Sequence, residues 1–194
     1  MKSTSATSPS EQELGDGIWL IRNFSDASEC EALIRHAEAK DFEAASITAA
    51  GGTEVDTAIR NNARIIEDDF ARASMLWERV RAYLPPFLSG RQAIGVNERF
   101  RFYRYDPGER FAGHEDAPFR RANGESSLLT FMIYLNDGFG GGDTSFREVT
   151  VAPEAGAALL FRHDLFHEGR EVIQGRKYVL RTDVMFNPPG RISE

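Results

Sequence analysis

The hydrophobic pattern changes from a helical period to strict alternation near residue 94, and this change limits the possible folds. In VNERFRFYRY (96–105), Phe100 and Phe102 alternate with Arg99, Arg101, Tyr103 and Tyr105, as in a strand whose two faces differ. Further strands are predicted at LLTFMIYLN (128–136), TSFREVTV (144–151), GAALLF (156–161) and KYVLRTDVMF (177–186). Two helical segments precede these strands, so the order predicts an α+β domain with a mostly β core.

The two helical segments are recognised by their apolar faces. In SDASECEALIRHAEAKDF (25–42), Ser28 and Glu31 have the spacing of a capping box. The second segment places Phe70, Ala73, Trp77, Val80 and Leu84 on one face and stops at Pro85. Between them, residues 45–62 are rich in Gly and Thr and are predicted to form a loop.

Length, charge and cysteine content exclude several classes of protein. The 194 residues suit one domain, which we place at 17–194 after a flexible N-terminal tail at 1–16. A net charge of −7 argues against nucleic acid as a partner. No apolar run approaches the ~20 residues needed to cross a bilayer, and no secretory signal is visible, so we expect no membrane partner and a cytoplasmic location. The single cysteine, Cys30, is expected to be a buried thiol. The pattern does not determine the oligomeric state.

The last predicted strand has one unusual face. In KYVLRTDVMF, one face is mostly apolar, whereas the other carries Lys177, Val179, Arg181, Asp183 and Met185. A solvent-facing surface is the common explanation for an antiparallel strand. The alternative is the inside of a barrel, where charged groups need partners or a ligand, and the neighbouring motifs favour this alternative.

The motif GHED (113–116) suggests a metal site. In a strand, residues i and i+2 point to the same face, so His114 and Asp116 would present an imidazole and a carboxylate together. The third ligand could be His36, His163 or His167. Two imidazoles and one carboxylate suit a non-haem Fe(II) oxygenase, because they leave coordination positions open. A simple surface ion pair is the alternative.

Four stretches in order resemble the Fe(II)- and 2-oxoglutarate-dependent dioxygenases, most closely the prolyl 4-hydroxylase-like branch. They are RFYRYDPGERFAGHED (101–116), LLTFMIYLNDGFGGGDTSF (128–146), GAALLFRHDLFHEG (156–169) and VIQGRKYVLRTDVMF (172–186). The resemblance covers residues 96–187. It implies a double-stranded β-helix, or jelly-roll, barrel with the N-terminal helices packed on one sheet.

The resemblance also implies a catalytic metal centre. His114, Asp116 and His167 match the iron ligands of the family, His167 because it precedes Glu168-Gly169 and lies ten residues before Lys177. His163 lacks that context and is interpreted as a local hydrogen-bonding residue, and His36 as a surface residue.

Five residues are candidates for contact with the cosubstrate. Lys177 matches the basic residue that binds the distal carboxylate of 2-oxoglutarate. Tyr134 matches a hydroxyl that helps to hold it, and Tyr105 is a second aromatic side chain beside it. Thr130 is either a further hydroxyl or a core threonine. Arg181 either pairs with Asp183 or Glu115, or contacts substrate or cosubstrate.

The implied reaction converts a substrate C–H to C–OH and releases succinate and CO2. It requires Fe(II), 2-oxoglutarate and O2, with ascorbate as a candidate reductant. Asp116 favours hydroxylation, because related halogenases lack the acidic ligand. The substrate is either a prolyl or other residue in a peptide or protein, or a free amino acid or other small molecule. A non-catalytic metal-binding structural module is the rival class.

Arginines are abundant around the first metal motif, and two explanations are open. Most arginines of this kind form a solvated face. Alternatively, some of them bind an anionic substrate at a rim for which residues 117–127 act as a lid. The residues concerned are Arg99, Arg101, Arg104, Arg110, Arg120 and Arg121.

Overall fold

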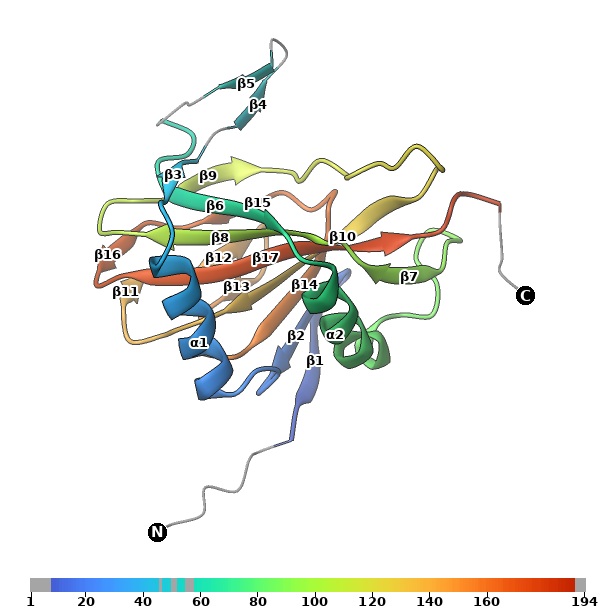
Figure 1. Cartoon of the computed structure of the whole chain (residues 1–194), viewed down its shortest axis with the longest axis horizontal. Helices are drawn as coiled ribbons and strands as arrows, with labels where there is room; N and C mark the ends of the chain where they lie inside the picture. The colour runs from blue at the N-terminus through green and yellow to red at the C-terminus, as the bar shows by residue number, and fades with distance from the viewer. Residues whose placement is uncertain (1–7, 46, 50–51, 55–57, 191–194) are drawn as a thin grey trace.

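The computed structural model describes residues 8–45, 47–49, 52–54 and 58–190, and two antiparallel sheets form its centre (Figure 1). Strand β17 (Lys177–Phe186) runs through the middle of the larger sheet, between β10 (Ser126–Tyr134) and β8 (Arg99–Tyr105). Strands on the β10 side are β14 (Ala158–Arg162), β2 (Ile18–Arg22) and β1 (Ser10–Gly15). Strands on the β8 side are β6 (Ala63–Asp68) and β3 (Glu43–Ala44), and β7 (Ala93–Val96) pairs with the far end of β17.

The smaller sheet carries the histidine motifs. Its order is β13 (Thr150–Val151), β12 (Thr144–Phe146), β15 (His167–Gly169) and β9 (Phe111–His114). Two short two-stranded sheets complete the strands: β11 (Gly140–Gly141) pairs with β16 (Val172–Gln174), and β4 (Ile47–Ala49) pairs with β5 (Gly52–Glu54). The predicted α+β class with a mostly β core is confirmed.

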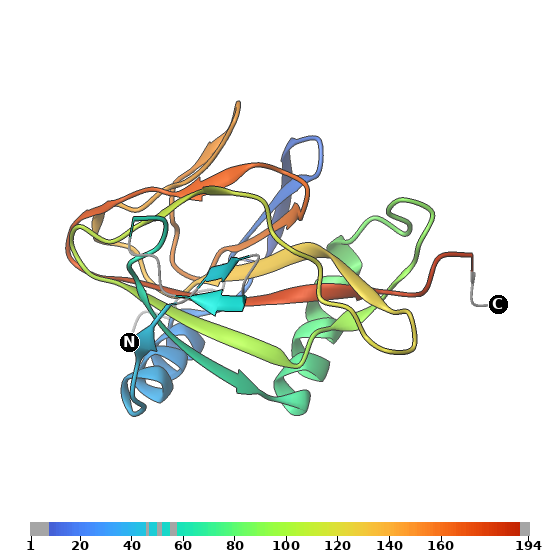
Figure 2. The same ribbon diagram turned by 90° about the horizontal axis from the view of Figure 1, so that it is seen from above.

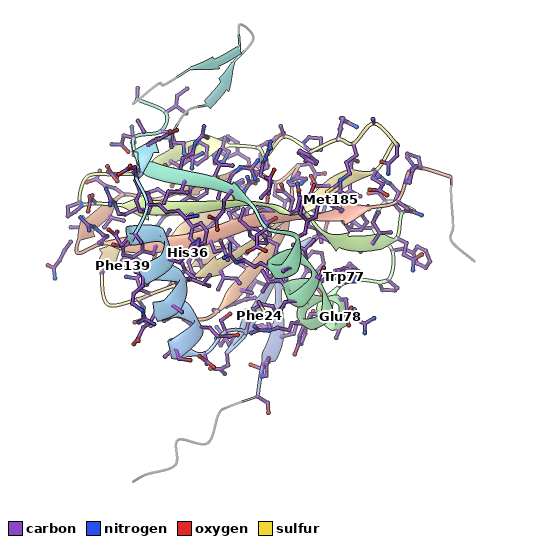
Figure 3. The ribbon with its side chains drawn as sticks, in the orientation of Figure 1. Phe24, His36, Trp77, Glu78, Phe139 and Met185 are labelled. Atoms are coloured by element: carbon purple, nitrogen blue, oxygen red, sulfur yellow. The ribbon has the colours of Figure 1, made fainter. Side chains whose placement is uncertain are left out.

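Both helices cover the outer face of the larger sheet (Figure 2). They are α1 (Ala27–Glu38) and α2 (Phe70–Val80), and a 3₁₀ turn, η1 (Arg81–Tyr83), follows α2. His36 of α1 and Trp77 of α2 lie on this helix-covered side (Figure 3). The core there joins apolar helix residues to apolar sheet residues, among them Cys30, Ala37, Leu76, Val80, Phe100, Phe102, Phe131 and Leu180. The expected packing of the helices on one sheet and the expected burial of Cys30 are thus confirmed.

A second core fills the space between the two sheets. Alternation along each strand sends one set of side chains to the helices and the other set inward. On β8, Phe100 and Phe102 face the helices, while Tyr103 and Tyr105 belong to the inner core. On β17, Leu180 faces the helices and Val179 faces inward. The charged face of β17 therefore lines the interior, as the second interpretation of that strand proposed.

Three local predictions need correction. The predicted tail is wrong for residues 10–15, which form β1 and pair with β2, while residues 1–7 lie outside the described residues. Helix α1 begins two residues earlier than the Ser28 cap predicted, because Asp26 is its N-cap. The Asp26 carboxylate accepts from Glu29 N at 2.8 Å, and the Glu29 carboxylate accepts from Asp26 N at 3.1 Å. The predicted loop at 45–62 contains the pair β4–β5, although part of this stretch lies outside the described residues.

Helix α2 also differs in detail from the predicted face. Phe70 starts the helix but is 70% exposed, and Leu76 takes a buried place instead. The α-helix ends at Val80, before Leu84, and continues only as the 3₁₀ turn. Among the described residues, no helix combines the length and the apolar character needed to cross a membrane.

Candidate active site

Three ligand-type side chains meet where β9 and β15 pair. His114 at the end of β9 lies directly opposite His167 at the start of β15, and Asp116 follows two residues after His114. Their ligand atoms all lie within 4.8 Å of one another. Asp116 lies between the imidazoles, with His114 Nε2 at 3.7 Å from Oδ1 and His167 Nε2 at 3.8 Å from Oδ2. The structure thus brings together the three residues that the sequence selected.

Backbone carbonyls orient both imidazoles. His114 Nδ1 lies 2.8 Å from the carbonyl oxygen of Ala112, and His167 Nδ1 lies 2.9 Å from that of Leu165. Because a carbonyl can only accept, each Nδ1 carries the proton and each Nε2 keeps its lone pair for a ligand. Burial lowers the pKa of His167 to about 4, although the charge of Asp116 opposes this shift. His167 is therefore neutral near pH 7, as a metal ligand must be.

The carboxylate of Asp116 is held in its ionised form. Burial alone would raise its pKa, but the charge of Arg181 and a hydrogen bond from Thr130 hold it well below the usual range. Arg181 Nη2 lies 3.0 Å from Asp116 Oδ1, and Thr130 Oγ1 donates to Oδ2 at 2.5 Å. Thr130 is thus a hydrogen-bond partner of a candidate ligand.

Arg181 sits between two carboxylates. Besides Asp116 it pairs with Asp183, whose Oδ1 lies 3.3 Å from Nη2. Of the two ionic partners weighed for Arg181, the structure provides Asp183; among the described ion pairs none joins it to Glu115. The Asp116 contact was not foreseen, because nothing in sequence spacing relates residues 116 and 181.

A cavity of about 460 Å³ opens beside the three ligand-type residues. Its wall combines residues of the two sheets with residues of the segments before β6 and after β9. The lining includes Arg60, Arg64, Arg101, Tyr103, Tyr105, Phe111, Glu115, Thr130, Met132, Thr144, Phe161, Lys177, Val179 and Arg181. His114, Asp116 and His167 form part of the same wall.

Lys177 is a buried cation in this wall. It is 2% exposed, and its Nζ donates to the carbonyl oxygen of Gly142 at 2.6 Å. Its ammonium also lies 5.2 Å from the centre of the Tyr105 ring. Burial lowers the pKa of Lys177 to about 8. Among the described residues no carboxylate is within ion-pair distance, so a ligand carboxylate would restore the charged form.

The hydroxyl of Tyr134 reaches the cavity through a neighbour. Tyr134 is fully buried and donates to Thr144 Oγ1 at 2.7 Å, and Thr144 lines the cavity. Tyr105 lines the cavity directly, opposite Lys177 in the β8–β17 register. Sequence reasoning missed Thr144, although its place after the glycine run was a usable signal.

The remaining histidines are outside the group of three. His163 is buried, with Nε2 2.9 Å from Ser127 Oγ and Nδ1 3.2 Å from Thr130 Oγ1. It is therefore the local hydrogen-bonding residue that was predicted. His36 lies on α1, where its Nε2 is 2.9 Å from Glu67 Oε1.

Of the six arginines noted in the sequence, only Arg101 lines the cavity. Most of the others contact carboxylates or backbone elsewhere: Arg99 pairs with Asp68, Arg104 with Glu38, Arg110 donates to the carbonyl oxygen of Ala58, and Arg121 pairs with Glu98 and Glu125. Arg60 and Arg64, which the sequence did not suggest, also line the cavity. Arg60 lies in a stretch without hydrophobic period, so no sequence pattern placed it.

Comparison with known proteins finds one matching family model and several structures of the same fold. Residues 100–182 match the sequence model of the 2OG-Fe(II) oxygenase superfamily, a segment that contains all three ligand-type residues and Lys177. Among curated protein sequences, none matches the chain.

Several solved structures share the fold. A Pseudomonas putida prolyl-4-hydroxylase superposes with a TM-score of 0.66 at 20% identity, covering 87% of this chain and 92% of the other. A viral collagen prolyl hydroxylase from Paramecium bursaria Chlorella virus-1, in complex with 2-oxoglutarate, superposes with a TM-score of 0.61 at 20% identity. The match covers 88% of this chain and 97% of the viral one. A Trichoplax adhaerens prolyl hydroxylase, in complex with a peptide fragment of the hypoxia inducible factor oxygen degradation domain, superposes with a TM-score of 0.67 at 19% identity. The match covers 87% of this chain and 83% of the other. The predicted jelly-roll barrel is confirmed.

Proposed function

We propose that the protein is a hydroxylase of the 2OG-Fe(II) oxygenase superfamily, because residues 100–182 match the sequence model of that superfamily, whose members are dioxygenases that use Fe(II), 2-oxoglutarate and O2. It converts a substrate C–H to C–OH and releases succinate and CO2. One observation carries the proposal: His114, Asp116 and His167 share a cavity wall with the buried ammonium of Lys177.

The donor set fits Fe(II). Two neutral imidazoles and one ionised carboxylate on one side of a metal leave positions for a chelating 2-oxo acid and for O2. When bound, the iron would supply the oxidation chemistry that no side chain can perform. The chain holds the donors ready, because the Ala112 and Leu165 carbonyls fix the imidazole orientation. Arg181 and Thr130 fix the carboxylate.

The opposite part of the wall fits the distal carboxylate of 2-oxoglutarate. Lys177 would bind it as a point charge, and the Thr144 hydroxyl, held by Tyr134, is available as a further donor. Tyr105 would pack against the carbon chain between the two ends. In this arrangement Arg181 is a positioning residue for Asp116, and it contacts neither carboxylate of the cosubstrate.

Two substrate classes follow from the comparisons and the sequence. The similar structures include prolyl hydroxylases, one of them in complex with a peptide fragment, which favours a prolyl or other residue in a peptide or protein. The second class is a free amino acid or other small molecule. A non-catalytic metal-binding module is the rival to both.

Succinate release tests the proposal. Purified protein with Fe(II), ascorbate, O2 and 2-oxoglutarate should produce succinate above the protein-free rate, even without a substrate. Asp116→Ala and His167→Ala should lose at least 100-fold of this activity and should also lose metal binding, measured by calorimetry with Mn(II). His36→Ala is the matched control, because this imidazole lies on the helix-covered side and should leave both values unchanged.

The rival class predicts a different result. A structural metal module would bind Mn(II) through the same three residues and release no succinate. Pools of peptides and amino acids, searched for a gain of one oxygen atom by mass spectrometry, would then separate the two substrate classes.

A further inference from the structure

The cavity wall carries more cations than the metal and the cosubstrate require. Five cationic side chains line the wall, against the two carboxylates of Glu115 and Asp116. Fe(II) and the dianion of 2-oxoglutarate together add no net charge. The positive excess would therefore remain after both were bound, within a chain whose net charge is −7.

The partners of these cations identify the ones in excess. Arg181 is paired with Asp116 and Asp183. Arg101 Nη1 lies 3.6 Å from Asp183 Oδ2. Lys177 is assigned to the cosubstrate. Arg60 remains, because no carboxylate among the described residues is within ion-pair distance of it. Arg64 also lines the cavity and lies close enough to Arg60 for the two charges to repel, while Glu43 acts on Arg64 with the opposite sign.

Arg60 is held rigidly against the cavity. It is 5% exposed, and its guanidinium carbon lies 4.3 Å from the centre of the Tyr103 ring and 4.2 Å from that of Phe111. Its Nε donates to Asn62 Oδ1 at 2.7 Å, but Nη2 is buried without a hydrogen-bond partner in the described part of the chain. A buried guanidinium with an unsatisfied N–H is costly unless a ligand completes it.

The electrostatic field around Arg60 favours an anion. Burial would raise the pKa of Tyr103, yet the charges of Arg60, Arg181 and Arg101 outweigh burial and lower this pKa to about 8. The same repulsion among cations acts on Arg64, whose pKa is lowered by burial and by the charges of Arg60 and Arg101. A negative group placed here would be stabilised by several cations at once.

The two ends of the cavity are set apart along the β8–β17 pair, and Arg60 lies over Tyr103, between Arg101 and Tyr105 on β8. Lys177 lies opposite Tyr105 and Arg181 lies opposite Arg101, so about 13 Å of strand separates the two pairs. Phe111, which stacks on Arg60, also stacks on the His114 ring at 3.6 Å between centres. A molecule bound at Arg60 would therefore lie beside the metal centre.

We propose that the substrate carries a carboxylate and that Arg60, Arg64 and Arg101 bind it, Arg60 through the buried Nη2. The inference rests on the proposed function and narrows its substrate class: a neutral internal prolyl residue does not meet this requirement, whereas a free amino acid or an acidic peptide residue does. Of these three arginines, the sequence alone suggested Arg101 for an anionic substrate but neither Arg60 nor Arg64.

Binding of a probe dicarboxylate tests the inference. Protein saturated with Mn(II) and 2-oxoglutarate, without O2, is titrated with glutarate and with its neutral diamide at constant ionic strength. Glutarate should bind at least tenfold more tightly than the diamide. Arg60→Gln should weaken glutarate binding about tenfold and leave 2-oxoglutarate binding within twofold. Arg99→Gln, on β8 but paired with Asp68 outside the cavity, should change neither.

A peptide arm distinguishes the sources of the carboxylate. Capped tripeptides Gly-Glu-Gly and Gly-Gln-Gly are compared in the same titration. Tighter binding of the glutamate peptide indicates that the substrate is an acidic residue in a peptide. Equal binding of the two peptides, together with tight binding of glutarate, indicates that the substrate is a free acid. The inference is overturned if glutarate and the diamide bind alike, if Arg60→Gln leaves glutarate binding unchanged, or if that variant weakens 2-oxoglutarate instead. Failure of the proposed function gives a different result, because the wild-type protein would then not bind 2-oxoglutarate. Glutarate binding that depends on Arg60 would still support the anion site in that case.

Discussion

At the level of single residues, the surroundings of Asp116 favour its charged form, whereas those of Lys177 favour its neutral form. Asp116 is buried but ionised, because Arg181 lies 3.0 Å away. Lys177 is buried without such a partner among the described residues, so its pKa is lowered to about 8. The first arrangement prepares a permanent metal ligand, and the second prepares a cation whose natural counter-charge is a ligand.

The lowered pKa of Lys177 predicts a pH-dependent affinity for 2-oxoglutarate. Only the protonated ammonium binds a carboxylate, and it is present below pH 8 and lost as the pH rises through 8. The dissociation constant should therefore rise about tenfold between pH 7 and pH 9. Calorimetry with Mn(II)-loaded protein measures it, and at the higher pH binding should be accompanied by proton uptake.

Two lysine variants make this prediction specific. Lys177→Arg keeps its charge throughout the range, so its affinity should be lower in absolute terms but nearly independent of pH. Lys40→Arg, in which the ammonium that pairs with Glu67 outside the cavity is replaced, should retain the wild-type profile. An unchanged wild-type affinity from pH 7 to pH 9 would show that Lys177 does not hold the carboxylate.

The residues that could be predicted from the sequence are those tied to a strand period or to a local motif. His114 and Asp116 lie in one tetrapeptide, and Lys177 stands at a fixed distance from His167. Arg60 was missed because it comes from an aperiodic stretch and reaches the cavity only through the pairing of Arg60 with Phe111. The contact between Arg181 and Asp116 was missed because Arg181 lies on β17 of the larger sheet, whereas Asp116 follows β9 of the smaller sheet.

At the level of elements, a tight turn ties β14 to β10 and to the start of α1. Gly156 N donates to Tyr134 O at 2.8 Å, and Ser25 N donates to Gly156 O at 2.9 Å. Gly156 has φ +79°, and a Cβ there would approach the Ser25 carbonyl oxygen to 2.1 Å. The glycine is therefore required both by its backbone conformation and by the close approach of another backbone segment.

Replacing this glycine should destabilise the fold strongly. Gly156→Ala combines left-handed strain with a backbone clash, so the free energy of unfolding should fall by more than ~2 kcal/mol. Gly90→Ala has a similar φ, +69°, but open space around the new methyl group, so it should cost only about 1 kcal/mol. Urea denaturation of both variants measures the difference, and equal losses would contradict the predicted clash.

Elements were predicted more reliably than their ends. Alternation in 96–105 and 177–186 predicted β8 and β17 together with the two faces that they present. The start of α1 was misplaced because Ser28 and Glu31 have the same spacing as Asp26 and Glu29, and only the backbone conformation selects between them. Strand β1 was missed because SEQELG is polar and shows no strand pattern. It forms a strand through its antiparallel pairing with β2.

At the level of the whole molecule, the site bridges the two sheets. His114 and His167 belong to the smaller sheet, whereas Lys177, Arg181 and Thr130 belong to the larger one. Asp116 connects the two, because it lies beside both imidazoles and accepts from Arg181 and Thr130. A metal and a 2-oxo acid bound together would therefore contact both layers of the barrel.

Binding across the layers should stabilise the molecule as a unit. At 100 times the dissociation constant, a ligand that binds only the folded state adds about 2.7 kcal/mol, which for a chain of this size raises Tm by about 5–10 °C. Mn(II) with 2-oxoglutarate should produce this shift in wild-type protein and in His36→Ala, but not in His167→Ala. Amide hydrogen exchange should slow in β9 and β15 of the smaller sheet as well as in β17, because the ligands join the two layers. Stabilisation that persists in His167→Ala, or protection confined to one sheet, would show that the ligands bind elsewhere than between the layers.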